Sequence, residues 1–176
     1  MGKVNALQLD CEGVLNLRSA FPTHEQYPND PASNSSWNLT KLPILEKSLL
    51  HTLPRISGMT VPWVYLGGPF SHFCFHTEDH DLFSINYMHL GGTKTWYSVP
   101  SRCYDALHKN WAGDHDLTSL LDVDQLKQHV DVYRVEQHWG EYVVTFPRAY
   151  HAGFNHAVHQ LYSNLRQSLT ILSSSM

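Results

Sequence analysis

Short runs rich in aromatic and β-branched residues occupy the middle of the chain and predict strands. Four of them follow at close spacing, over residues 61–66, 71–78, 82–89 and 93–99. Clusters of Gly or Asp separate the runs, as expected between short antiparallel strands. Two more strands are predicted over 132–135 and 141–146, the second ended by Pro147, and residues 153–155 indicate a turn or strand end.

Helical periodicity is confined to three short stretches. Between residues 42 and 53, leucines at five positions fit one face of an amphipathic helix. Ser101 is a candidate N-cap for a helix to about residue 109, and a further helix is predicted over 123–129. Residues 1–40 are loop-rich. Many short strands with a helical insertion predict a mainly β fold, either a sandwich or a jelly-roll barrel.

Length, composition and charge narrow the class of protein. The chain has 176 residues, 42% of them hydrophobic, which suits one globular domain. Twelve Lys and Arg against 16 Asp and Glu argue against a domain that binds nucleic acid through its phosphates. Three scattered cysteines argue against a disulfide scaffold or a cysteine-rich zinc module. Prolines and glycines interrupt the uncharged stretch 56–77, which therefore predicts buried strands rather than a membrane span.

Histidine is unusually abundant and suggests a metal site. There are 13 histidines, more than all Lys and Arg together. His76 and Glu78 lie two apart in a predicted strand, so both point to the same face. Two histidines and one carboxylate are the ligand set of many non-haem Fe(II) oxygenases. His151, expected at a rim between a strand and a turn, is the best candidate for the third ligand, and His72 and His80 are its rivals.

Several ordered motifs resemble the Jumonji C (JmjC) domain, in particular that of histone lysine demethylases of the JARID and JMJD2 types. The matching blocks extend over about residues 36–156. They are Gly58-Met-Thr-Val-Pro-Trp-Val-Tyr65, Phe73-Cys-Phe-His76-Thr-Glu78, Ser84-Ile-Asn86-Tyr, Lys94-Thr-Trp96-Tyr and Gly140-Glu-Tyr-Val-Val-Thr-Phe-Pro-Arg-Ala-Tyr-His151.

This resemblance implies a double-stranded β-helix, a jelly-roll or cupin-like barrel, that uses Fe(II), 2-oxoglutarate and O₂. His76, Glu78 and His151 match the family's iron ligands, and therefore its catalytic residues. Lys94 matches the lysine that pairs with the distal carboxylate of 2-oxoglutarate. Asn86, Trp96 and Phe73 match further positions around the co-substrate. Tyr65 and Gly58 match positions that contact the methylated lysine. Simple alternation places Phe73 on the face opposite His76.

The resemblance further implies a histone lysine demethylase, with the tail of histone H3 as the expected substrate. The N-methyl group is hydroxylated and leaves as formaldehyde. A nuclear location and association with chromatin complexes follow from the same resemblance, without sequence-specific nucleic acid binding or a membrane span. Two alternatives remain: a protein hydroxylase on the same scaffold, and a catalytically impaired chromatin scaffold or reader.

The chain departs from the family pattern mainly near its ends. A tyrosine that also contacts 2-oxoglutarate has no clear counterpart, and Asn5 is the nearest match. Before Lys94 this chain has Gly91-Gly92-Thr93, where the family usually has Gly-Glu-Pro. After Asn155 it lacks the Glu-x-x-Asn-Phe motif of the family's last strand, which puts that strand in doubt. We expect one JmjC domain over 1–176, with a lead-in over 1–35, a core over about 36–165 and a tail over 166–176.

Overall fold

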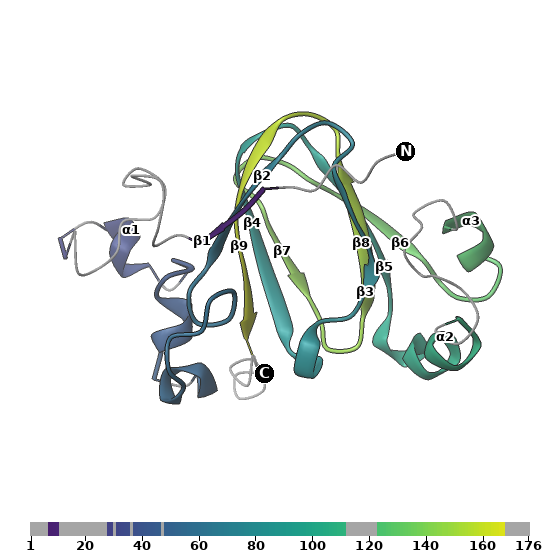
Figure 1. Ribbon diagram of the computed structural model, residues 1–176, viewed down its shortest axis with the longest axis horizontal. Coiled ribbons are helices and arrows are strands. Elements are labelled where there is room, and N and C mark those ends of the chain that lie inside the picture. The colour runs from purple at the N-terminus through teal and green to yellow at the C-terminus, as the bar shows by residue number, and fades with distance from the viewer. Residues whose placement is uncertain are drawn as a thin grey trace.

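Two antiparallel sheets form the molecule (Figure 1). The computed structural model describes residues 7–10, 28–29, 31–35, 37–46, 48–111 and 123–167. In these residues the larger sheet has the order β1 (Leu7–Asp10), β2 (Trp63–Gly67), β9 (His159–Gln167), β4 (Phe83–Gly91) and β7 (Tyr142–Thr145). The smaller sheet has the order β3 (His72–His76), β8 (Tyr150–Asn155), β5 (Lys94–Val99) and β6 (Tyr133–Gln137).

Helical segments cover the outer faces of both sheets (Figure 1). The N-terminal segments lie outside the larger sheet and are α1 (Pro31–Asn34), η1 (Leu42–Ile44) and η2 (Leu49–Thr52). The insertion after β5 lies outside the smaller sheet and contains η4 (Ser101–Cys103), α2 (Tyr104–Trp111) and α3 (Val123–Leu126). A last short turn, η3 (Asp79–Asp81), links β3 to β4.

The predicted fold class is confirmed. The four central strands, the two later strands and the helical insertion all form close to their predicted places. From β2 to β5 and from β6 to β9, consecutive strands of the chain alternate between the two sheets, as in a jelly roll. Within the described residues no hydrogen-bonded strand pair joins one sheet to the other, so the barrel is an open sandwich.

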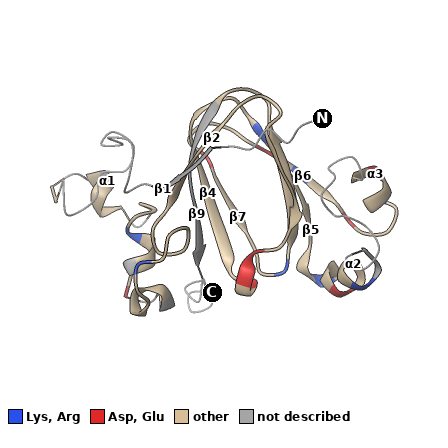
Figure 2. Cartoon of the chain, in the orientation of Figure 1, with Lys and Arg blue, Asp and Glu red and all other residues tan. Residues whose placement is uncertain are grey.

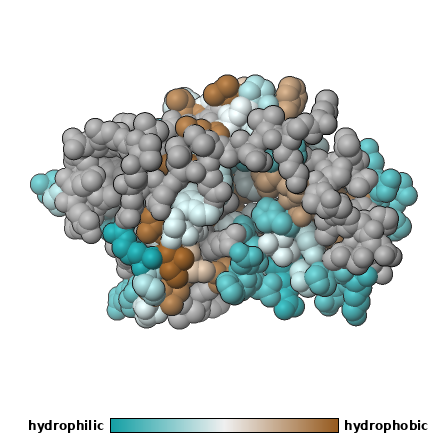
Figure 3. Space-filling model, viewed as in Figure 1, coloured by the Kyte–Doolittle hydropathy of each residue, from teal (hydrophilic) through white to brown (hydrophobic). Residues whose placement is uncertain are grey.

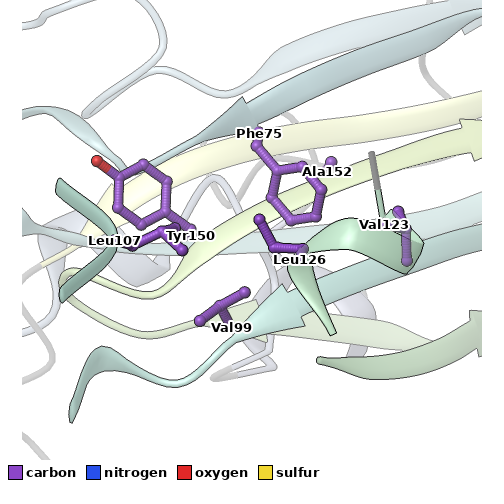
Figure 4. Close-up of a cluster of buried hydrophobic side chains, with 7 residues drawn as sticks. All are labelled: Phe75, Val99, Leu107, Val123, Leu126, Tyr150 and Ala152. Atoms are coloured by element: carbon purple, nitrogen blue, oxygen red, sulfur yellow. The ribbon is translucent and has the colours of Figure 1, made fainter. Parts of the chain in front are cut away.

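Hydrophobic side chains gather outside the sheets rather than only between them. Figure 4 shows one cluster, in which Leu107 of α2 and Leu126 of α3 cover the outer face of the smaller sheet. The sheet contributes Phe75, Val99, Tyr150 and Ala152 to this cluster. A second cluster joins Leu39, Val64 and Ile85 outside the larger sheet. The outer clusters therefore bury hydrophobic side chains of both sheets, so the inner faces of the sheets can carry polar residues.

The space between the sheets is lined by polar side chains. Because side chains alternate along a strand, the neighbours of the outer cluster residues point inward. On β8 these are His151, Gly153 and Asn155, and on β4 they include Ser84 and Asn86. Most are nevertheless buried. Figure 2 shows strands almost free of charge, with an acidic turn at η3. Burying so many polar groups is costly without partners, which points to a binding site between the sheets.

Two local predictions are wrong, and a third is confirmed. Residues 42–53 form two separate 3₁₀ turns, because Leu45 is extended and the Ser48 hydroxyl accepts a hydrogen bond that starts the second turn. Residues 153–155, predicted as a turn or strand end, form the end of β8. The doubtful last strand is present as β9, which pairs with both β2 and β4. Asn5 lies outside the described residues.

The turns at one end of the sandwich expose single hydrophobic residues. Phe70, Leu90, Trp139 and Val158 are all more than half exposed, and hydrophobic atoms are visible along the upper edge in Figure 3. Among the described helices, none has both the length and the hydropathy needed to cross a membrane.

Candidate metal centre

A β-bulge brings Phe73 and His76 to the same side of β3. The pairing of β3 with β8 shifts register between these two residues. A bulge adds one residue to a strand and therefore reverses the alternation beyond it. The ring centroids of Phe73 and His76 are 5.7 Å apart, so the prediction from simple alternation is wrong. Glu78 follows in extended conformation and, as predicted, joins His76 on the inner face.

His151 is the third member of the cluster. It pairs with His76 across β3 and β8, and their ring centroids are 4.3 Å apart. His151 is 3% exposed, so its predicted position at a rim is wrong. It lies inside β8, which begins at Tyr150. One donor atom from each of His76, Glu78 and His151 lies within 4.8 Å of the others. In the described part of the chain, no other three potential ligand residues lie this close together. His72 and His80 are therefore not part of the cluster.

Hydrogen bonds orient both histidines for a metal ion. Nδ1 of His76 lies 2.8 Å from the Cys74 carbonyl oxygen, and Nδ1 of His151 lies 2.9 Å from the Ala149 carbonyl oxygen. A carbonyl oxygen can only accept, so each Nδ1 carries the proton. In the neutral ring this leaves the Nε2 lone pair available as a ligand. Two imidazoles and a carboxylate in this arrangement fit a divalent iron ion.

Glu78 is ionised despite its burial. Burial acts to raise the pKa of this carboxyl, but side-chain interactions with His151 and Ser84, and the positive charge that His151 and His76 carry when they are protonated, outweigh it and lower the pKa to about 2. Nε2 of His151 lies 3.5 Å from Glu78 Oε1. A buried carboxylate that stays charged at neutral pH is a suitable metal ligand.

Lys94 lies buried beside the metal candidates, between two aromatic rings. Its Nζ is 4.7 Å from the ring centroid of Phe73 and 5.2 Å from that of Trp96. Lys94 and Trp96 share the inner face of β5, as predicted. The Trp96 and His151 rings have centroids 6.2 Å apart, which connects Lys94 to the metal cluster.

The charge of Lys94 fits an anionic ligand. Burial lowers the pKa of this ammonium group from 10.5 to about 7. A buried cation is stabilised by an anion within reach, and a lysine presents a compact charge for it. A carboxylate within reach of Nζ would satisfy this requirement.

Gln137 is a pocket residue that the sequence did not reveal. It is fully buried at the end of β6 and pairs with Lys94 across the strands. The Trp96 Nε1–H donates to Gln137 Oε1 at 2.9 Å. The Gln137 amide donates to the main-chain oxygens of Asn86 and Glu141, at 3.2 and 3.0 Å. Asn86 itself is buried on the inner face of β4, in the opposite sheet.

The two predicted substrate residues both lie against Trp63. Tyr65 is half-buried in β2, and its ring lies edge-on to that of Trp63, with the two ring centroids 6.1 Å apart. Gly58 has φ of 76°, and a Cβ there would lie 2.9 Å from the Trp63 ring. Gly58 is therefore required both by backbone conformation and by space. The motif indicated Gly58 and Tyr65, but not that both lie against the Trp63 ring.

Strained backbone surrounds the ligands. His80, Asp81 and Arg148 have φ between 52° and 59°, a region that costs non-glycine residues about 1–3 kcal/mol and is common at functional sites. Arg148 Nε donates to Asp81 Oδ2 at 2.8 Å. This exposed ion pair joins the turn after Glu78 to the turn before His151, so it connects the two segments that carry the ligands.

Gly153→Ala is expected to destabilise the protein by about 1–3 kcal/mol. A Cβ at Gly153 would lie 2.6 Å from the Thr95 carbonyl oxygen and 2.8 Å from the Phe73 ring, and neither can retreat without moving β5 or the pocket. Chemical denaturation measures the effect. Gly68→Ala is the matched control, because a Cβ there meets nothing within 4 Å. Equal stability of the two variants would contradict the close approach of Phe73 to β8.

Comparison with known proteins is consistent with this geometry. The sequence profile of the family described as "JmjC domain, hydroxylase" matches residues 63–160. Lysine-specific demethylase 5B from Gallus gallus is 43% identical over 158 residues, which is 82% of this chain and 10% of that protein. Lysine-specific demethylase 5D from Homo sapiens is 46% identical over 70% of this chain and 9% of its own length. Lysine-specific demethylase JMJ703 from Oryza sativa subsp. japonica is 45% identical over 76% and 12%, respectively. The chain thus spans about a tenth of the length of these relatives.

Proposed function

The chain belongs to the JmjC domain family, and from this premise we propose that it is an Fe(II)- and 2-oxoglutarate-dependent demethylase of methylated lysine in a histone tail, with H3 as the expected histone. The observation that carries the proposal is that two histidines, one ionised carboxylate and one lysine lie together between the sheets. The names of the relatives support lysine demethylation.

In this proposal each pocket residue has one task. His76, Glu78 and His151 hold the iron, and their hydrogen bonds keep Nε2 of both rings directed at it. Lys94 binds the distal carboxylate of 2-oxoglutarate, while Phe73, Trp96 and Asn86 shape the space around the co-substrate. When bound, iron, 2-oxoglutarate and O₂ together supply the oxidation of a C–H bond, with succinate and CO₂ as co-products. Enclosure between the sheets excludes water from the reacting centre.

Tyr65 and Gly58 are proposed to receive the methylated lysine. An aromatic ring attracts a methylammonium through its π face, and an exposed backbone oxygen accepts weak C–H···O contacts. The hydroxylated methyl group then leaves as formaldehyde. A nuclear location, association with chromatin complexes and a single domain with a core over about 36–165 form part of the same proposal.

A protein hydroxylase is the second candidate, because the family description itself reads "hydroxylase". Both activities need the same ligands and differ in whether the hydroxylated product is stable. Hydroxylation of a carbon attached to nitrogen gives a product that breaks down, whereas hydroxylation elsewhere leaves the oxygen in place.

Mass spectrometry of methylated H3 peptides separates the candidates. Incubation with Fe(II) and 2-oxoglutarate is expected to remove one methyl unit and release formaldehyde, and His76→Ala is expected to do neither. A gain of one oxygen without formaldehyde would favour the hydroxylase. No change in mass, together with no binding of 2-oxoglutarate in calorimetry, would leave a chromatin scaffold or reader.

A further inference from the structure

Gln137 occupies a position where one side chain bridges the two sheets beside the pocket. Its amide oxygen accepts from Trp96 of β5, and its amide nitrogen donates to Asn86 of β4 and to Glu141 before β7. β5 and β4 belong to opposite sheets, which have no hydrogen-bonded strand pair between them in the described residues. The bond from Trp96 stays within the smaller sheet, whereas the two bonds that the amide donates cross to the larger sheet and depend on the spacing of the sheets at the end where Lys94 lies.

The Trp96 indole is held by this amide on one edge and by aromatic contacts on its faces. Its centroid is 5.0 Å from that of Phe73 at an interplanar angle of 64°. Lys94 Nζ lies over both rings. A rotation of the indole would remove the Trp96 face from the ammonium group and alter the space in which Phe73 lies.

We propose that Gln137 is a positioning residue that sets the affinity for 2-oxoglutarate by fixing the Trp96 indole against Lys94. This inference rests on the proposed function of the pocket. Gln137 touches neither the metal candidates nor the ammonium group by any hydrogen bond, so it acts through Trp96. Its side chain is uncharged and has both the acceptor and the donors that this junction requires, which no apolar residue of the same size provides.

Gln137→Met tests the role, because methionine has a similar volume and makes none of the three hydrogen bonds. Calorimetric titration of 2-oxoglutarate into Mn(II)-loaded protein is expected to show about tenfold weaker binding than in the wild type. The indole hydrogen of Trp96, identified by its loss in Trp96→Phe, is expected to exchange slowly with solvent in the wild type and rapidly in Gln137→Met. Two-dimensional NMR measures this exchange without any turnover.

A double-mutant cycle distinguishes positioning from general support of the fold. If Gln137 acts through Trp96, adding Gln137→Met to Trp96→Phe weakens binding by much less than tenfold. Two controls accompany it. Gln125→Met makes the same chemical change on an exposed residue of α3, and Leu126→Ala destabilises the outer cluster. Neither is expected to alter the affinity for 2-oxoglutarate.

The outcomes are separable. Unchanged affinity in Gln137→Met, or a full tenfold loss on the Trp96→Phe background, would overturn the positioning role. If Gln137→Met does not fold, the wild type and Trp96→Phe decide the question. Rapid exchange of the Trp96 indole hydrogen in the wild type would overturn the positioning role. Slow exchange there, together with weakened 2-oxoglutarate binding in Trp96→Phe, supports it. Failure of the wild type to bind 2-oxoglutarate would instead reject the proposed function and, with it, this inference.

Discussion

His76→Ala is expected to abolish stoichiometric binding of Fe(II). The cluster offers three protein ligands to an ion, and the remaining pair, Glu78 and His151, is a weak site. Loss of a hydrogen-bond partner behind a ligand already costs about 10–100-fold in affinity, so loss of the ligand itself is expected to cost more than about a hundredfold. Anaerobic titration with Fe(II), followed by measurement of bound iron after gel filtration, gives the result directly.

His72→Ala is the matched control for this experiment. His72 begins the strand that His76 ends, and its side chain is exposed and outside the cluster. It is expected to bind iron as the wild type does, at an unchanged melting temperature. Undiminished iron stoichiometry in His76→Ala would remove the assignment of all three ligands, since two residues of the cluster do not form a closed site.

Periodicity predicted the strands well because each sheet has one face in a hydrophobic cluster. On β4, Ile85 and Tyr87 of the outer cluster alternate with Ser84 and Asn86 in a pattern of period two, and that pattern is readable in the sequence. The helix expected over residues 42–53 was wrong for the corresponding reason. Its leucines satisfy helical spacing, but Leu45 adopts an extended conformation that interrupts the helix, and spacing alone does not reveal this.

The wrong prediction for Phe73 originates in contacts between strands distant in sequence. A bulge arises from the pairing of β3 with β8, so nothing within residues 72–76 shows that Phe73 will turn toward His76. The strand end expected at residues 153–155 is present, but the sequence does not show why Gly153 is a glycine. The Phe73 ring and the Thr95 carbonyl oxygen require it, because they approach β8 from two neighbouring strands.

Motifs located the chemical groups but not the residue that holds them together. His76, Glu78 and Lys94 each have a recognisable spacing, and the structure brings them into one pocket with His151. Gln137 shows no such spacing, because its three partners lie on other strands or in the next turn. Its only signal in the sequence was a polar residue at the end of a strand, which most often indicates a solvated position.

Lys94→Met is expected to weaken binding of 2-oxoglutarate by on the order of a hundredfold or more, and at the same time to stabilise the protein without ligand. Leaving a buried charge without its partner costs about 3–5 kcal/mol, which corresponds to this loss of affinity. Calorimetry on Mn(II)-loaded protein measures the binding, and chemical denaturation measures the stability. Lys127→Met, at an exposed position just after α3, is the control and is expected to change neither.

The stability that Lys94→Met gains over the wild type should decrease as the pH rises. Burial lowers the pKa of Lys94 from 10.5 to about 7, so the unfolded chain binds an extra proton between these values and wild-type stability rises with pH across this window. The advantage of Lys94→Met is therefore largest at or below pH 7 and shrinks toward pH 10.5.

Ligand affinity should follow the opposite direction. A bound carboxylate needs the charged lysine, so wild-type affinity for 2-oxoglutarate is expected to fall as the pH rises above about 7, with uptake of a proton on binding. Lys94→Met should lose this dependence. A flat pH profile in the wild type, or a variant no more stable than the wild type at pH 7, would contradict the burial of an unneutralised ammonium group. The same burial that costs the empty protein stability then gives the lysine its strength as an anion ligand, because little water competes with the carboxylate.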